Sequence, residues 1–258
     1  MKLLIYPDSI HRKWKITKLK VFCEAAGIEV VTDKTKPFDR VIYWSYHKTF
    51  RPHSIDTVNL DNRHRMINFG CADIRKSKVE NVMLQSFGYN AIINPEQSTN
   101  FLEKSELQGA HSLRICSKFE GYKGNCIYVK FLDGRIDEQT VRDYRIYVFG
   151  DKISLVVTKD KSVNDLFAGS LKSKMQCYYD PLELFTEKEI ENILNFCSKY
   201  RVEVTELDAM RDSDGRLYIV DNNNIPAYST TEKELFEADN CKVLKYVSND
   251  LKEFLEQW

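Results

Sequence analysis

Three oxygen-bearing side chains near the end of the chain have the types and spacing of a site for a hard cation. Asp221 and Asn223 are two residues apart, so an extended chain directs both side chains to one face. Asp208 lies in the preceding segment, and pairing of the two segments would bring it beside them. Two carboxylates and an amide carbonyl suit Mg²⁺, which proteins usually hold through one or two carboxylates together with substrate phosphates. The alternative is an exposed acidic hairpin.

The segments around these side chains predict a β-hairpin. Residues 202–207 alternate as a strand does, and residues 217–220 form a second strand. The turn between them, residues 212–215, reads D-S-D-G, and its glycine adopts a positive φ at little cost. We expect the last two ligands to follow the second strand, and Pro226 to end the ladder pairing.

Residues 206–226, E-L-D-A-M-R-D-S-D-G-R-L-Y-I-V-D-N-N-N-I-P, resemble the C-terminal signature of ATP-grasp enzymes. That superfamily includes the D-alanine–D-alanine ligases, the ribosomal-protein glutamate ligases and some inositol phosphate kinases. The resemblance implies that Asp208, Asp221 and Asn223 bind the Mg²⁺ ions that bridge the phosphates of ATP. Asp221 stands where glutamate is commoner in the family, a tolerable change for a carboxylate ligand.

The same resemblance implies that two lysines bind the nucleotide phosphates. Lys104 matches the family's strand lysine, which is followed by a small-residue loop, although a single Gly109 replaces the usual glycine-rich run. Lys78, just before a predicted helix, matches a second phosphate-binding lysine, with Lys76 as the alternative. The chemistry requires a fixed cation beside the phosphates and a backbone that can approach closely. Around Lys78, a solvated charge cluster is the other interpretation.

The strand predicted over residues 127–132 matches the family segment that links the two lobes and pairs its backbone with the adenine edge. Lys130, Phe131 and Leu132 would then bind the nucleotide, with apolar side chains walling the ring. The alternative is an edge strand that turns at residues 133–134.

A second predicted hairpin, residues 142–153, turns at Gly150-Asp151 and carries a D-x-R strand that resembles the ATP-grasp core. Arg145 is the candidate catalytic residue, because a guanidinium offers planar, paired donors to a phosphate or acyl phosphate. Lys159, at the end of the returning strand, is a candidate for a further positive charge. Asp143 is a candidate for orienting the arginine.

The order of the elements predicts an α/β fold. Strands over residues 2–6, 28–31 and 41–46, with a helix that ends at Gly27, indicate a small α/β domain with parallel pairing. With the resemblance, we expect an N-terminal α/β domain over residues 1–75 and ATP-grasp lobes over residues 76–258. The nucleotide lid lobe would comprise residues 76–132 and the metal-binding lobe residues 133–258. Residues 162–179 are expected to be a loop, and a capping box predicts a helix from Thr186.

Composition excludes several classes of protein. Lys+Arg and Asp+Glu both number 38, which argues against a protein that coats nucleic acid or binds membranes through a polybasic patch. No apolar run approaches the roughly 18 residues of a membrane span. The 7 cysteines are scattered and never form C-x-x-C, which indicates a reducing cytoplasm rather than zinc binding. His47, His53 and His64 lack metal-ligand spacing.

The resemblance implies an ATP- and Mg²⁺-dependent carboxylate–amine ligase that forms an acyl phosphate on a small-molecule substrate. The alternative is an ATP-grasp kinase that phosphorylates a hydroxyl of a small molecule or sugar. Such kinases need a strongly basic acceptor pocket, so the neutral total charge favours the ligase. A non-catalytic binding protein is a third reading, which the order of the candidate lysines, arginine and oxygen ligands argues against.

Overall fold

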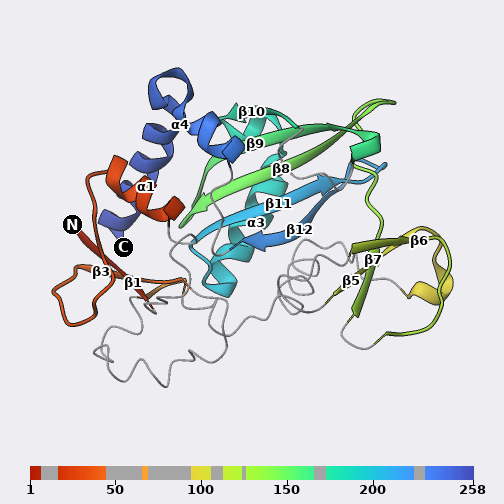
Figure 1. Ribbon diagram of the computed structural model, residues 1–258, viewed down its shortest axis with the longest axis horizontal. Helices are drawn as coiled ribbons and strands as arrows, with labels where there is room; N and C mark the ends of the chain where they lie inside the picture. Colours follow the sequence, from red (N-terminus) through yellow and green to blue (C-terminus); the bar gives the residue numbers. More distant parts are fainter. Residues whose placement is uncertain are drawn as a thin grey trace.

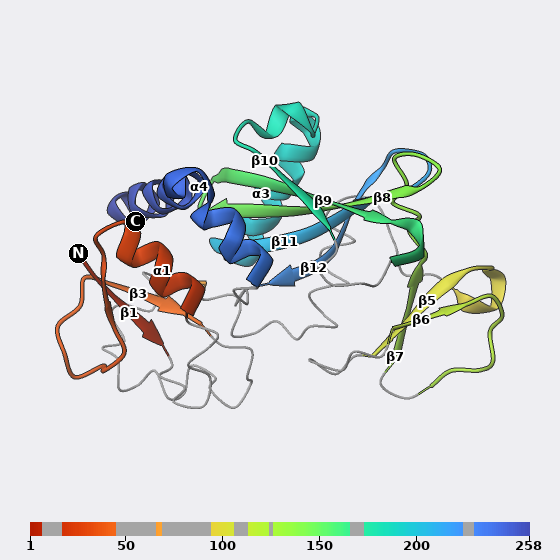
Figure 2. The same cartoon turned by 45° about the horizontal axis from the view of Figure 1, so that its top comes forward.

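Three β-sheets follow one another along the part of the chain that the computed structural model describes, residues 1–6, 17–44, 66–68, 94–105, 113–123, 126–165, 173–223 and 230–258. The four-stranded N-terminal sheet and the three-stranded sheet lie at opposite ends of the molecule, and the five-stranded sheet lies between them (Figures 1 and 2). The mixture of sheets and helices confirms the predicted α/β class.

The N-terminal sheet is parallel and has the order β2-β1-β3-β4. Its strands are β1 (Lys2–Tyr6), β2 (Glu29–Val31), β3 (Arg40–Tyr43) and β4 (Met66–Ile67). Helix α1 (Thr17–Ala25) connects β1 to β2 and stops before Gly27, whose φ of 68° few other residues adopt. Parallel pairing in this region was predicted from the strand–helix–strand order and is confirmed.

The three-stranded sheet is antiparallel, with β5 in the middle between β6 and β7. Its strands are β5 (Phe101–Ser105), β6 (Leu113–Cys116) and β7 (Cys126–Lys130), and a 3-10 turn, η6 (Pro95–Gln97), precedes them. Phe101, Cys116 and Tyr128 form a small core of their own. The predicted domain boundary at residues 75–76 lies outside the described residues.

The five-stranded sheet is antiparallel and has the order β10-β9-β8-β11-β12. Its strands are β8 (Thr140–Phe149), β9 (Lys152–Ser162), β10 (Lys174–Tyr178), β11 (Val204–Arg211) and β12 (Leu217–Asn223). Short 3-10 turns, η7 (Val163–Asp165) and η9 (Pro181–Glu183), flank β10. Both predicted hairpins are confirmed, β8–β9 with its turn at Gly150 and β11–β12 with its turn at Gly215.

Strand β10 corrects the prediction of a loop over residues 162–179. It is an edge strand in which Met175 and Cys177 contact the core while Lys174 and Gln176 are exposed. A half-exposed edge strand has the polar composition of a loop, which explains the error.

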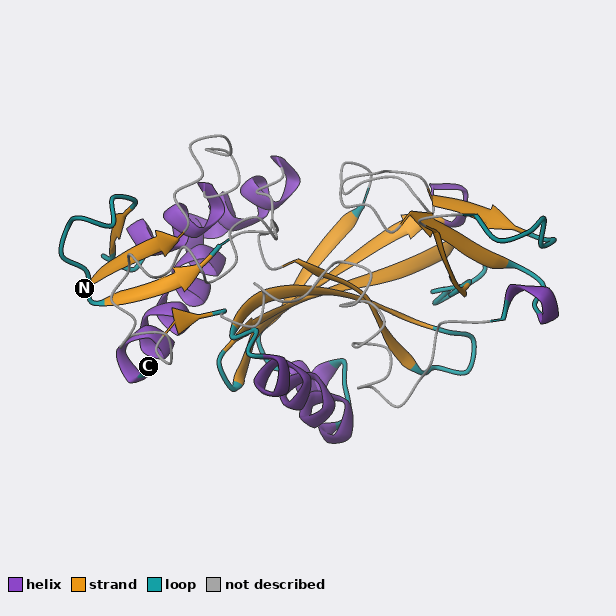
Figure 3. Cartoon of the chain, turned by 90° about the horizontal axis from the view of Figure 1, so that it is seen from below, coloured by secondary structure: helices purple, strands orange, loops and turns teal. Residues whose placement is uncertain are grey.

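The two faces of the five-stranded sheet differ in chemistry. Helix α3 (Glu187–Tyr200), which begins with the predicted capping box of Thr186 and Glu189, covers one face (Figure 3). That face is apolar and packs Ile146, Leu207 and Ile219 against the helix. The opposite face carries most of the charged side chains described below.

Helix α4 (Thr230–Gln257) closes the fold by packing on α1 and on β8 and β9. It is one span that includes two residues with a positive φ, Asn240 and Cys241. A single core includes Leu3 of β1, Phe22 of α1, Leu155 of β9 and Leu251 of α4. No helix within the described residues is both long and apolar enough to cross a membrane.

Candidate active site

Three charged residues lie in register on neighbouring strands of the five-stranded sheet. Arg145 of β8 pairs with Asp208 of β11, and Asp208 pairs with Asp221 of β12. Residues that are paired across a ladder present their side chains to the same face, with neighbouring strands about 4.8 Å apart. The hairpin therefore places the two carboxylates side by side, as the sequence predicted, with the candidate catalytic arginine on their other flank.

Asp208 is held by three hydrogen bonds before any ligand binds. Arg145 donates from Nε to Oδ1 at 2.8 Å and from Nη2 to Oδ2 at 3.2 Å, and Asn223 donates from Nδ2 to Oδ2 at 2.9 Å. Burial would raise the pKa of Asp208, but the positive charges of Arg145 and Lys159 outweigh burial and lower that pKa to about 2. Asp208 is therefore ionised at neutral pH, as a Mg²⁺ ligand must be.

A β-bulge in β12 decides which of its side chains join this face. The register shifts after the Asp208–Asp221 pair, because Ala209 pairs with Ile219 and Val220 is the extra residue. Without the bulge, Asp221 would face α3 together with Ile219. Our expectation that Asp221 and Asn223 follow the strand was wrong, since β12 continues to Asn223 and the pairing itself aligns them.

Lys159 of β9 brings a second positive charge to the same face. Its Nζ lies 3.9 Å from Oδ1 of Asp208, and its side chain is 7% exposed. Burial lowers the pKa of Lys159, and the charge of Asp208 opposes that shift. Asp143 does not orient Arg145 as we expected, because it forms an ion pair with Lys161 of β9.

An apolar patch lies next to the carboxylates, where the chain enters from the three-stranded sheet. Leu132 and Tyr218 are buried there and pack with Met210 and Val220. Met210 is two residues from Asp208 on β11, about 7 Å along the strand, and faces the same side. The amide of Gly134 donates to the carbonyl of Arg211 at 3.1 Å, which ties the connecting segment to this end of the hairpin.

Comparison with known proteins identifies the fold. The chain is similar to the ATP-grasp ligase PsnB in complex with a minimal precursor, Mg and ADP, with a TM-score of 0.60 and 12% identity over 98% of this chain and 96% of that one. It is similar to the macrocyclase MdnC from Microcystis aeruginosa MRC, bound to the precursor peptide MdnA, with a TM-score of 0.59 and 12% identity over 100% of both chains. The chain has the ATP-grasp fold.

The D-alanine–D-alanine ligase from Bacillus anthracis shares the ATP-grasp fold with this chain at a TM-score of 0.52 and 14% identity, over 100% of this chain and 99% of that one. No family model matches the sequence, and no curated protein sequence is similar to it.

Two of the remaining predicted residues lie on strands of the three-stranded sheet. Lys130, at the end of β7, forms an ion pair of 2.7 Å with Asp212, and Phe131 and Leu132 follow it toward the apolar patch. Lys104 lies on β5, the middle strand of its sheet, where it pairs with Leu113 and Ile127. The Lys104 side chain, the loop after β5, Lys78 and the three histidines of residues 47–64 lie outside the described residues.

The donor set fits a hard cation that is shared with a ligand. Within the part of the chain that the structure describes, no three His, Cys, Asp or Glu side chains are arranged to hold a metal by themselves. Asp208, Asp221 and Asn223 supply two carboxylates and one amide, so they need further oxygens from a bound molecule. This incomplete protein set is typical of Mg²⁺ bound together with nucleotide phosphates.

Sequence reasoning missed two buried residues beside Arg145. Glu232, at the start of α4, accepts a 2.6 Å hydrogen bond from Nη1 of Arg145, and Lys18 of α1 lies 3.2 Å from the same oxygen. The only local signal is that each has apolar residues one turn further along its helix, and that signal is too weak to identify a partner so distant in the chain.

Proposed function

We propose that the protein is an ATP-dependent ligase that joins a carboxylate to an amine and uses Mg²⁺ held by Asp208, Asp221 and Asn223. The observation that carries the proposal is the alignment of Arg145, Asp208 and Asp221 on one sheet face, about 7 Å from an apolar patch. In this arrangement the apolar patch would contact a purine ring, and the charged residues beside it would bind phosphates.

The nucleotide would lie between the three-stranded and five-stranded sheets. Leu132 and Met210 offer apolar surface to the adenine ring, and the backbone of residues 130–132 would pair with its polar edge. Lys104 and Lys78 would bind the phosphates. The structures of PsnB with Mg and ADP support this assignment of cofactors.

Arg145 has donors to spare for an anionic substrate. A guanidinium has five N–H bonds, and its hydrogen bonds to Asp208 and Glu232 use three. The remaining N–H bonds would bind the transferring phosphoryl group, and Lys159 would add a second positive charge beside it. A bound Mg²⁺ supplies charge neutralisation at the phosphate oxygens.

The proposed reaction has two steps. A carboxylate oxygen of the substrate attacks the γ-phosphorus of ATP, so that a new O–P bond forms while the bond to the ADP oxygen breaks. An amine then attacks the acyl carbon, inorganic phosphate leaves with the bonding electron pair, and the amine loses a proton. Arg145 would offset the negative charge that accumulates on the phosphoryl oxygens in both steps.

Two observations support a ligase over the alternative kinase. The similar structures named above are ligases, and two of them, PsnB and MdnC, are bound to precursor peptides. In addition, the described groups around Arg145 do not form the strongly basic pocket that such a kinase needs, because two lysines lie among four carboxylic acids: Lys18, Lys159, Glu206, Asp208, Asp221 and Glu232. Because PsnB and MdnC are bound to precursor peptides, we propose a peptide carboxylate as a substrate in addition to a small-molecule one.

The experiment is incubation of the protein with ATP, Mg²⁺ and pools of peptides and metabolites, with hydroxylamine as a surrogate amine. A ligase releases ADP and phosphate in equal amounts and produces a hydroxamate from the acyl phosphate. Production of ADP with a stable phosphorylated product and no free phosphate would identify a kinase instead. Asp208→Asn serves as the inactive control.

A further inference from the structure

A network of buried charges lies behind Arg145, on the side away from solvent. Lys18 comes from α1 and Glu232 from the first turn of α4, and their side chains are 0% and 1% exposed. At this burial neither side chain can contact a substrate. Any effect of this pair on a reaction must therefore pass through the groups that it touches.

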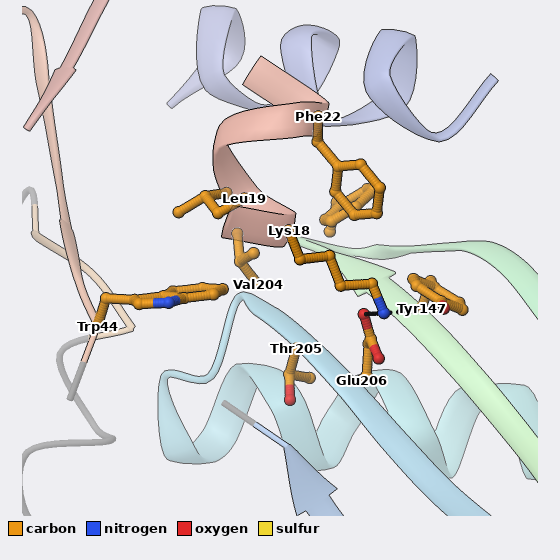
Figure 4. A pocket seen from close by; sticks show the side chains of 9 residues that line it. Lys18, Leu19, Phe22, Trp44, Tyr147, Val204, Thr205 and Glu206 are labelled. Carbon is orange, nitrogen blue, oxygen red and sulfur yellow. Dashed lines mark hydrogen bonds and ion pairs between the residues drawn. The ribbon is translucent and has the colours of Figure 1, made fainter. Parts of the chain in front are cut away.

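Lys18 is the centre of this network. Its Nζ lies 2.5 Å from Oε1 of Glu206 and 3.2 Å from Oε1 of Glu232, and it donates to the Tyr147 hydroxyl at 3.2 Å. Figure 4 shows Lys18 extending from α1 toward Glu206 and Tyr147, beside the apolar side chains Phe22 and Leu19 that share its pocket. A lysine so deeply buried is tolerated only because carboxylates surround it.

Glu232 connects this network to the candidate catalytic arginine. Its Oε1 accepts hydrogen bonds from Nη1 of Arg145 at 2.6 Å and from the Tyr147 hydroxyl at 3.2 Å. The opposite edge of the guanidinium, Nε and Nη2, is held by Asp208. Arg145 thus donates hydrogen bonds to two carboxylates, of which Asp208 belongs to the proposed metal site and Glu232 does not.

The contacts of Arg145 with Asp208 and with Glu232 respond differently when a ligand binds. A cation that binds Asp208 competes with Arg145 for the same oxygen lone pairs, so it weakens the hydrogen bonds between Arg145 and Asp208. Glu232 is buried behind the arginine and its hydrogen bond to Nη1 does not involve the proposed metal ligands. Lys18 and Tyr147 in turn fix Glu232, because each contributes a separate contact to the same oxygen.

We propose that Glu232, held by Lys18 and Tyr147, is a positioning residue that keeps Arg145 aligned when Asp208 engages a cation. The proposal deepens the proposed function, on which it rests insofar as Arg145 acts on the substrate. It also gives α1 of the N-terminal region a role in the chemistry of the five-stranded sheet.

The first test is kinetic and uses Glu232→Gln, which keeps the shape and removes the charge. We expect kcat to fall by about tenfold or more while the KM for ATP stays within about twofold. In an Arg145→Lys background the same substitution should change kcat by less than about threefold, because the group that it positions is gone. Equal effects in both backgrounds would overturn the proposal.

The matched control is Glu237→Gln, the same change on the same helix. Glu237 is exposed and forms an ion pair with Lys233 at 3.7 Å, so we expect unchanged kinetics. If Glu232→Gln does not fold, Lys18→Met combined with Glu232→Gln removes one charge of each sign and keeps the buried region neutral. We expect the same loss of kcat from this pair, and normal kcat would overturn the proposal.

A second test does not depend on turnover. NMR of arginine-labelled protein measures the rotation of the Arg145 guanidinium about its Nε–Cζ bond, with the resonance assigned from Arg145→Lys. With Mg²⁺ and ADP present, we expect Glu232→Gln to accelerate this rotation by about tenfold relative to wild type and to Glu237→Gln. The same rotation rate in all three would overturn the positioning role. The test requires binding of Mg²⁺ but no turnover, so it also applies if the protein is not a ligase.

Discussion

Arg145 and Asp208 face each other across the β8–β11 ladder, and the arginine donates to both carboxylate oxygens, at 2.8 Å and 3.2 Å. This two-point contact fixes the orientation of the proposed metal ligand in the protein alone. The two side chains are therefore already oriented in the protein alone, as the proposed chemistry requires.

We predict that Asp221→Asn lowers ATP turnover or shifts its Mg²⁺ dependence to higher concentration, while thermal stability without metal holds or rises slightly. Asp221 lies beside the ionised Asp208, so removal of its charge relieves repulsion in the metal-free protein. Turnover across a Mg²⁺ titration and a thermal melt measure the two effects. Asp214→Asn, in the exposed turn of the same hairpin, is the control. A variant that unfolds but turns over normally where folded would make the hairpin acids structural.

We predict that acid unfolding is coupled to Asp208. Its pKa of about 2 in the folded protein lies below the ordinary value of about 3.9, so the folded state binds this proton more weakly than the unfolded chain. The resulting stabilisation, about 2–3 kcal/mol, is complete above about pH 5 and is lost as the pH falls through about 2. Urea unfolding at a series of pH values measures the slope, which Asp208→Asn should flatten. An identical slope in the variant would show that other carboxylates control acid unfolding.

We predict that Lys104→Ala weakens nucleotide binding at least about tenfold, equivalent to about 1.4 kcal/mol. The prediction rests on the position of Lys104 on β5, next to the loop that would cover the phosphates. Calorimetric titration with Mg²⁺ and ADP measures it. Lys123→Ala is the control, because that exposed lysine of the same region contacts only Glu103 among the carboxylates described there. Unchanged affinity in Lys104→Ala would remove the assignment.

We predict that Gly134→Ala weakens nucleotide binding more than Gly215→Ala does. Both glycines have a positive φ, 63° and 77°, so alanine costs about 1–2 kcal/mol of backbone strain at either position. Only at Gly134 would the new Cβ meet a neighbour, the Cε of Met210 at 2.6 Å, and so disturb the apolar patch. Thermal melts and ADP titrations of both variants separate strain from binding. Equal affinities would contradict the prediction that Met210 contacts the bound nucleotide.

The hairpin that carries the proposed metal ligands was predictable because its information is local. A D-S-D-G turn, alternating strands and the two-residue spacing of Asp221 and Asn223 are all visible in one short stretch. The bulge at Val220 was not predictable, since it exists only in the register between β11 and β12. Because of that register, the candidate ligands Asp221 and Asn223 lie within β12 rather than after it.

The network of buried charges behind Arg145 could not be predicted from the sequence for a different reason. Lys18 and Glu232 are 214 residues apart, and each alone reads as an ordinary charged residue of an amphipathic helix. Their contact depends on how α1 and α4 pack on the sheet, which no local pattern encodes. The predicted division of the chain at residues 75–76 remains a prediction.

The core that joins Leu3 and Phe22 to Val247 and Leu251 has a consequence for the synthesis of the protein. Leu3 and Phe22 cannot complete their burial until α4 has been translated, although they also pack on neighbouring residues of the N-terminal region. At about 5–20 residues per second, strand β1 and helix α1 wait roughly 10–45 s for that partner. Part of the apolar surface of β1 and α1 therefore stays exposed to solvent during that interval.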